Sequence, residues 1–256
     1  MVERIWILQN GTIDLDQSVL VAGRGYGNRL TVPVSSALLE TDQGYILIDT
    51  GLNPLGIKEP ESTWGPRAKL LLPTITVEWD IRTQLKRIGI STEDVNTVIL
   101  THLHWDHTGG LQYFRHAKIV VQKAERRFAY EPDQCMAGSY MKNHFDFDLK
   151  YETIEGDVEY GDGIDILFTP GHTPGHQSVL VTLGNGKRCI IPGDAVYSYQ
   201  NLEEMLPPGN CWDVQQSMLS LNKLKTVARL TGAAIYPSHD PDIDMIGRAN
   251  KEMETC

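Results

Sequence analysis

Four side chains that can bind a metal ion lie within six residues of this sequence, at His102, His104, Asp106 and His107. They follow the apolar run at 98–100, which predicts a buried strand ending at the cluster. Residues two apart in extended backbone point the same way, so His102 and His104 can bind one ion. The turn that follows would bring Asp106 and His107 round to the same cavity. Imidazole suits zinc, iron, cobalt and nickel, and a carboxylate adds charge and can hold a second ion.

Three further side chains that can bind a metal ion lie at the ends of strand-like segments later in the chain: His172, Asp194 and His239. His172 lies in a Pro- and Gly-rich turn, within a four-residue unit that is repeated over 169–176. Asp194 and His239 each end a short apolar run. A lone histidine at a strand end is usually structural, but all three downstream of the first cluster form a strong joint signal. Together the ligands exceed what one four-coordinate ion needs.

The pattern resembles the metallo-β-lactamase superfamily over most of the chain. The segment Leu-Ile-Asp-Thr-Gly at 47–51 resembles the first motif of that superfamily, and Thr-His-Leu-His-Trp-Asp-His-Thr-Gly-Gly at 101–110 resembles the second. His172, Asp194 and His239 resemble the third, fourth and fifth. Within the superfamily the chain resembles the quorum-quenching N-acyl homoserine lactonases. The residues that carry this closer resemblance are 169–178, 194–197 and 238–240.

The resemblance implies an α/β fold, an αββα sandwich of two mixed β-sheets flanked by helices, with the metals at the edge between the sheets. It implies one ion held by His102, His104 and His172, and a second held by Asp106, His107 and His239. Asp194 would bridge the two ions together with a water or hydroxide. Zinc is the first expectation for both positions, and iron, cobalt and manganese fit the same ligands. The resemblance also suggests a homodimer.

The activity implied is opening of the lactone ring of N-acyl homoserine lactones by the bridging hydroxide. Tyr197 would donate a hydrogen bond to the developing oxyanion. Asp106 would carry a proton to the leaving ring oxygen. Asp49 has no place among the ligands, so it would orient a ligand by a hydrogen bond, or cap the strand that precedes it. The sequence has no Gly-x-Ser-x-Gly nucleophile motif, so no covalent intermediate is expected.

Other hydrolases use the same kind of centre and stay open as alternatives. A glyoxalase-II-like thioesterase would add a C-terminal helical region with basic groups, and few residues follow His239 here. An organophosphate hydrolase or another lactone hydrolase is chemically possible on the same ligands. A nuclease of this superfamily would be expected to have a basic surface. A non-catalytic protein on this fold would be expected to have lost ligands, whereas all seven are present.

Composition agrees with a soluble enzyme and argues against a nucleic-acid or membrane protein. The 256 residues are predicted to form one domain, 1–256, and carry a net charge of −10, which argues against nucleic acid or an anionic membrane as the main partner. No apolar run approaches the ~20 residues that span a bilayer, and the first residues do not resemble a signal peptide. Cys135, Cys189, Cys211 and Cys256 are far apart and are expected to be free thiols. A cytoplasmic location is therefore predicted.

Apolar patterning gives the expected elements. Strands are predicted near 3–8, 18–22, 34–40, 44–49, 97–100, 118–122, 151–154, 164–168, 178–183, 188–192 and 233–236. Helices are predicted over 78–88, 123–130 and 214–230. Two irregular segments could line a pocket or simply pack on the core: the Pro-rich 53–77, which could also make a dimer contact, and 131–149, where Phe145 could contact an acyl chain.

Overall fold

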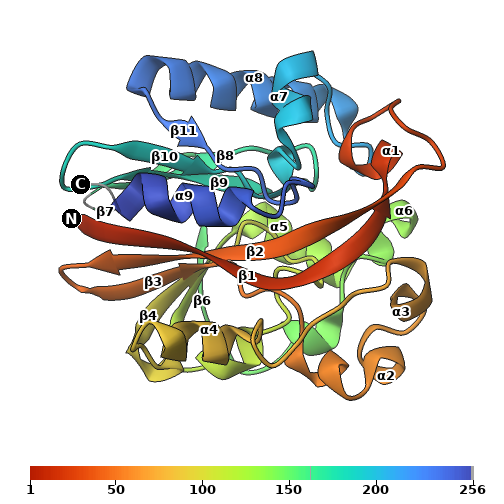
Figure 1. Cartoon of the computed structure of the whole chain (residues 1–256), viewed down its shortest axis with the longest axis horizontal. Helices are drawn as coiled ribbons and strands as arrows, with labels where there is room; N and C mark the ends of the chain where they lie inside the picture. The colour runs from red at the N-terminus through yellow and green to blue at the C-terminus, as the bar shows by residue number, and fades with distance from the viewer. Residues whose placement is uncertain (162, 255–256) are drawn as a thin grey trace.

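A computed structural model describes residues 1–161 and 163–254 and shows two β-sheets packed face to face (Figure 1). The first sheet has the order β1 (Val2–Asp16), β2 (Arg29–Thr41), β3 (Gly44–Ile48), β4 (Val95–Ile99), β5 (Lys118–Gln122), β6 (Lys150–Ile154). The second has the order β11 (Ala234–Ile235), β10 (Arg188–Ile191), β9 (Gln177–Thr182), β8 (Ile164–Phe168), β7 (Val158–Gly161). Both sheets mix parallel and antiparallel pairs: β3 to β6 are parallel, as are β10 and β11, and the other pairs are antiparallel.

Helices cover the outer faces of the two sheets (Figure 1). α4 (Ile81–Arg87) and α5 (Lys123–Tyr130) lie on the first sheet, and α7 (Tyr199–Glu204) and α8 (Val214–Thr231) lie on the second. α9 (Met245–Glu254) packs along β1. The shorter helices are α1 (Gln17–Leu20), α2 (Pro60–Trp64), α3 (Arg67–Leu70) and α6 (Gln134–Ala137), and the 3₁₀ turns are η1 (Pro54–Ile57), η2 (Thr92–Asp94), η3 (Leu111–Phe114), η4 (Lys142–His144) and η5 (Gly193–Ala195). The predicted αββα sandwich of two mixed sheets is confirmed.

The inner strands β3, β4 and β5 of the first sheet contain short apolar runs whose side chains are buried on both faces. Because successive side chains alternate across a strand, Leu47 and Val98 pack under α4, in a cluster with Leu85. Their neighbours Ile48 and Ile99 face the other way and meet residues of the second sheet in the central core. Ligands at the ends of these strands are therefore placed by a rigid scaffold.

The helix ends follow local capping chemistry. Asp80 accepts a hydrogen bond from the Arg82 N–H at the start of α4, and Asp213 accepts from the N–H groups of Gln215 and Gln216 at the start of α8. α8 ends at Gly232, which has a left-handed φ of +71°.

Most predicted elements are confirmed, and one is wrong. β5, α5 and β8 have the predicted bounds. The strand predicted at 18–22 is wrong, because residues Gln17–Leu20 form α1, where the Asp16 carboxylate accepts from the Ser18 N–H and begins a helical turn. The apolar pattern does not predict β7 or the helices α2, α3, α6, α7 and α9.

Both irregular segments contribute to the core. Trp64 of the Pro-rich segment is fully buried and packs edge-on against Trp105, with their ring centroids 6.2 Å apart. Phe145 is fully buried beside Tyr130 in the cluster under the first sheet. Of the two readings of this residue, the structure therefore favours core packing over contact with a ligand.

The helix α9 is joined to the edge of the first sheet by one side chain. The Asn250 carboxamide accepts a hydrogen bond from the Ile7 N–H at 2.7 Å and donates one to the Ile7 carbonyl at 3.0 Å. Met245, Ile246 and Ala249 of the same helix enter the central core. α9 therefore occupies part of the free edge of β1.

Two findings bear on the environment expected for the chain. Cys135, Cys189 and Cys211 are free thiols, whereas Cys256 lies outside the described residues. Among the described residues, no helix is both long enough and apolar enough to cross a bilayer.

Candidate metal centre

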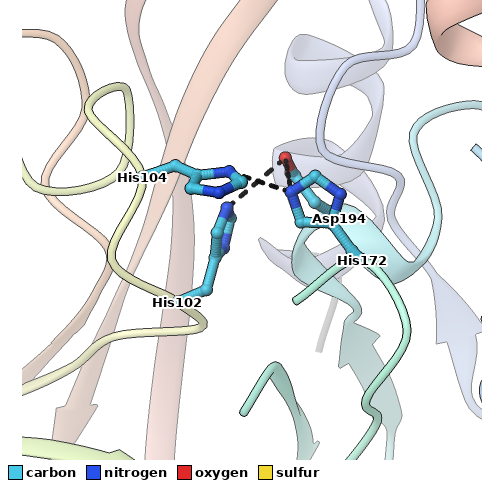
Figure 2. Close-up of side chains that lie close together, drawn as sticks. All are labelled: His102, His104, His172 and Asp194. Carbon is cyan, nitrogen blue, oxygen red and sulfur yellow. Dashed lines mark hydrogen bonds and ion pairs between the residues drawn. The ribbon is translucent and has the colours of Figure 1, made fainter. Parts of the chain in front are cut away.

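Four of the predicted ligands converge at one end of the sandwich (Figure 2). His102 and His104 lie on the loop after β4, His172 on the loop between β8 and β9, and Asp194 on η5 after β10. All four are buried. The Nε2 atom of His172 lies 3.0 Å from Nδ1 of His104 and 3.3 Å from Oδ2 of Asp194, and Nε2 of His102 lies 3.6 Å from the same oxygen.

The other three predicted ligands, Asp106, His107 and His239, form a second group beside the first. The Nε2 atoms of His107 and His239 lie 3.9 Å and 3.7 Å from Oδ2 of Asp106. The same two atoms lie 3.2 Å and 3.3 Å from Oδ1 of Asp194. The structure thus brings together all seven side chains that the sequence singles out.

Asp194 faces both groups with different oxygens. Its Oδ2 faces His102 and His172, and its Oδ1 faces His107 and His239. Ligand atoms bound tetrahedrally to one zinc ion at about 2.0–2.1 Å lie roughly 3.4 Å apart, which is close to these separations. The arrangement is that of a carboxylate placed between two ion positions.

The far nitrogen of four imidazole rings is held by an acceptor, which sets the tautomer. Nδ1 of His107 donates to Asp49, Nδ1 of His172 to the Asn210 carbonyl, and Nδ1 of His239 to the Pro33 carbonyl, at 2.8, 2.7 and 2.7 Å. Nδ1 of His102 lies 3.0 Å from the Thr101 hydroxyl, which itself donates to Asp49. In its neutral form each ring therefore carries its proton on Nδ1, which leaves the Nε2 atom directed at the centre free for a metal ion.

The nitrogens that point inward fit a cation. Nε2 of His102 and Nε2 of His107 are buried and have no hydrogen-bond partner. Buried polar atoms are nearly always paired, so a cluster of unpaired acceptors beside a carboxylate calls for positive charge. Burial, with His107 and His104 nearby, holds the pKa of His102 well below its usual value, so a proton does not supply that charge there. The donor set of imidazoles and carboxylates suits divalent zinc and its neighbours.

His107 shows the same demand for positive charge in another form. Burial lowers the pKa of His107, but the carboxylates of Asp194, Asp49 and Asp106 outweigh burial and raise this pKa well above its usual value. A proton and a metal ion would therefore compete for the same Nε2 atom, and binding of the ion would release the proton.

Several groups hold Asp194 in place. Its backbone N–H donates to Nε2 of His176 at 3.0 Å, and its Oδ1 accepts from the Ser238 hydroxyl at 3.0 Å. Gly193 precedes it with a φ of +53°, and a Cβ there would lie 2.8 Å from both His176 and Thr101, so the turn requires glycine. His176 is outside both ligand groups, yet it contacts the residue between them.

Tyr197 lies between the two groups. Its ring centroid is 5.7 Å from that of His172 and 5.0 Å from that of His239. Burial, with the carboxylates of Asp194 and Asp106, raises the pKa of Tyr197 well above its usual value, so its hydroxyl stays a hydrogen-bond donor. A hydrogen-bond donor in this place can stabilise negative charge that develops on a group bound beside it.

Sequence reasoning missed Glu125 entirely. The run Lys-Ala-Glu-Arg-Arg at 123–127 reads as a solvated helix face, but Glu125 is fully buried and accepts a hydrogen bond from Leu103, which lies between two ligands. Nothing in the local pattern distinguishes it from its exposed neighbours.

Comparison with known proteins agrees with this geometry. The sequence profile of the metallo-beta-lactamase superfamily matches residues 29–239. The N-acyl homoserine lactonase AttM of Rhizobium radiobacter is 33% identical over 246 residues, covering 93% of this chain and 94% of that protein. An N-acyl homoserine lactonase of Bacillus cereus is 34% identical over 240 residues, with coverage of 93% and 94%. A solved N-acyl homoserine lactone hydrolase, with the product N-hexanoyl-L-homoserine bound at its catalytic metal centre, superposes with a TM-score of 0.84 at 33% identity, covering 94% of each chain.

The fold, the two ligand groups and the matched profile show that the chain belongs to the metallo-β-lactamase superfamily. Its full-length similarity to the two lactonases places it in the N-acyl homoserine lactonase branch of that superfamily.

Proposed function

We propose that this protein is a dinuclear metal hydrolase that opens the lactone ring of N-acyl homoserine lactones. One observation carries the proposal: six side chains form two ligand groups around Asp194 in a chain whose relatives are named N-acyl homoserine lactonases. A solved relative with its product at the metal centre supports the same substrate class.

In this proposal each ligand group holds one ion. His102, His104 and His172 would hold the first, Asp106, His107 and His239 would hold the second, and Asp194 would serve both. We expect zinc in both positions, with iron, cobalt and manganese able to replace it. Two such ions would polarise the lactone carbonyl and make hydroxide available near neutral pH, because coordination brings the pKa of water to about 7.

The residues of the chain then act on charge and protons. The Tyr197 hydroxyl donates a hydrogen bond to the carbonyl oxygen as negative charge develops there, which stabilises the transition state more than the bound lactone. The oxygen of the attacking water forms a bond to the carbonyl carbon, and the bond between that carbon and the ring oxygen then breaks. Asp106 passes the proton of the attacking water to the ring oxygen, which leaves as a hydroxyl group. The product is an N-acyl homoserine, whose new carboxyl group releases one proton at neutral pH.

An apolar cluster beside the ligands supports an acyl substrate. Trp105 lies between the ligands His104 and Asp106 in the sequence, and Tyr197 lies between His172 and His239 in space. Both belong to one buried apolar cluster. Its other fully or largely buried members are Ile13, Leu15, Leu20, Val21, Val32, Val34, Leu52, Trp64 and Ile75. The acyl chain is expected to approach the ions from the side of the partly exposed residues that pack against this cluster, among them Leu30, Leu71 and Met141, because apolar contact stabilises a hydrocarbon chain.

The test is proton release on addition of N-acyl homoserine lactones with short and long acyl chains. Metal-loaded protein should release one proton per lactone, and chelated protein should release none. The ring-opened acyl homoserine serves as the control, because it has no further proton to release by this reaction. Failure of a sample containing two ions per chain to acidify any of these lactones would contradict the lactonase proposal, and thioesters and phosphotriesters would then be assayed on the same sample.

We also propose a homodimer located in the cytoplasm, with no nucleic acid or membrane as a partner. The negative net charge of −10 supports the exclusion of nucleic acid and anionic lipid. Sedimentation of the metal-loaded protein should give twice the mass of one chain, and a single-chain mass would contradict the dimer.

A further inference from the structure

Glu125 is a buried carboxylate that the proposed reaction does not use. It lies on α5 and is fully buried. A glutamate side chain is almost never fully buried unless hydrogen bonds or an ion pair satisfy its carboxylate. Its partners are neutral donors: the hydroxyls of Thr173 and Tyr140 and the backbone N–H groups of Leu103 and Gly175. Burial raises the pKa of Glu125, and these hydrogen bonds oppose that shift.

The two carboxylate oxygens bond to two different loops. Oε1 accepts from the Leu103 N–H at 2.9 Å, and Leu103 stands between the ligands His102 and His104. Oε2 accepts from the Thr173 hydroxyl at 2.6 Å, and Thr173 follows the ligand His172. One side chain thus joins the loop after β4 to the loop between β8 and β9.

Two further contacts fix the same region. The Tyr140 hydroxyl donates to Oε1 of Glu125 at 3.0 Å, and the Tyr140 ring lies edge-on to His104 with centroids 4.7 Å apart. Gly175 packs directly on the start of α5, where an added Cβ would lie 2.0 Å from the Glu125 nitrogen. The loop that carries His172 therefore sits against the helix that carries Glu125, and the carboxylate fills the space between them.

We propose that Glu125 is a positioning residue that sets the separation of the two loops carrying His102, His104 and His172. It acts through Leu103 and Thr173. The other ligand group is held by different contacts, because His107 donates to Asp49 and His239 donates to the Pro33 carbonyl. The loss of Glu125 should therefore weaken the first ion position more than the second. This inference rests on the metal centre described under the proposed function, and it is independent of which ester is hydrolysed.

The test is metal binding by Glu125→Gln, Glu125→Ala and Thr173→Val, with Leu85→Ala as the control. Leu85 is fully buried on α4 in the same apolar cluster as Leu103, but it is not a hydrogen-bond partner of Glu125, so its truncation destabilises the fold without breaking the bonds between the two loops. Metal-free protein is titrated with zinc against a chromophoric chelator, and the thermal midpoint is measured in parallel. Histidine ¹⁵N signals report which rings remain bound. Wild type should bind two ions.

Glu125→Ala and Thr173→Val should weaken one ion by about 10- to 100-fold, with loss of the bound signals of His102 and His172 before those of His107 and His239. Glu125→Gln should weaken it less, because its carbonyl can still accept from Leu103. Leu85→Ala should lower the thermal midpoint and leave both affinities unchanged.

Three results would decide against the inference or against its basis. Unchanged affinities in both Glu125→Ala and Thr173→Val would overturn the positioning role. Should Glu125→Ala fail to fold, Thr173→Val decides alone, because it removes only the hydroxyl donor at nearly constant volume. Fewer than two ions in wild type would overturn the metal centre itself, whereas two ions without lactone hydrolysis would refute the proposed function and leave the role of Glu125 standing.

Discussion

Replacement of Asp49 by asparagine should weaken the metal centre although Asp49 is not a ligand. The carboxylate accepts from three donors: the Thr101 N–H at 2.8 Å, the Thr101 hydroxyl at 2.7 Å, and Nδ1 of His107 at 2.8 Å. The backbone should tolerate the change, since Asp49 has a φ of +59° and asparagine adopts this region as readily as aspartate. The perturbation is therefore confined to hydrogen bonding.

Neither orientation of the new amide satisfies these donors. If its nitrogen faces His107, the ring must release its Nδ1 proton, and the proton moves to the Nε2 atom that points at Asp194. If its nitrogen faces the Thr101 N–H, two fixed donors oppose each other. An unpaired buried donor costs about 1–3 kcal/mol, which corresponds to roughly 5- to 150-fold in an equilibrium constant. We expect the second ion to bind about 10- to 100-fold more weakly.

The assay is zinc titration against a chelator, together with ¹⁵N spectra that identify the tautomer of His107. Thr101→Val is the matched control: it removes the hydroxyl that lies beside His102 and leaves the bond between His107 and Asp49, so the His102 signal should change first. The reasoning would be refuted by an Asp49→Asn protein that binds both ions as tightly as wild type with Nδ1 of His107 still protonated.

Three further perturbations test other parts of the centre. Tyr197→Phe should lower kcat for lactone hydrolysis on the order of a hundred-fold while both ions stay bound. Tyr199→Phe is the control, because Tyr199 is two residues further on and partly exposed, and its kcat should not change. If Tyr197→Phe has the same kcat as wild type, Tyr197 does not stabilise the oxyanion. Asp106→Asn should lower kcat by orders of magnitude and weaken the second ion, and near-wild-type turnover with two ions bound would contradict both assigned roles. Burial lowers the pKa of His144 to about 4. Between about pH 6.5 and pH 4 the unfolded chain therefore binds a proton at His144 and the folded chain does not. Proton binding stabilises the unfolded chain, so the free energy of unfolding falls as the pH falls. Between pH 7 and pH 5, metal-free wild type should therefore lose about 2 kcal/mol more than metal-free His144→Gln in urea unfolding, and an equal loss in both would show that His144 is not responsible.

The sequence predicts those parts of the structure that depend on local pattern. The metal ligands could be predicted because each follows an apolar strand or a Gly-rich turn, and because four of them lie within six residues. α5 and β8 could be bounded because their periodicity is regular and because turn residues flank them. The strand predicted at 18–22 is wrong because the capping of α1 by Asp16 outweighs the strand preference of an apolar run.

The contacts that support the ligands could not be predicted, because they join segments far apart in the chain. Nδ1 of His239 donates to the Pro33 carbonyl across 206 positions, and His172 reaches the Asn210 carbonyl across 38. A backbone carbonyl has no residue-type signature at all. Glu125 has a side chain that could be recognised, but its burial follows from the packing of two loops on α5, which only the folded chain shows.

The bond between Asn250 and Ile7 has a consequence for the behaviour of the folded protein at high concentration. β1 is the edge strand of its sheet and is 15 residues long, and a long open edge can pair with a strand of another molecule and lead to aggregation. By filling the donor and acceptor of Ile7 from a helix, α9 closes part of that edge (Figure 1). Asn250 of α9 thus limits intermolecular strand pairing at Ile7, in addition to the contribution that α9 makes to core packing.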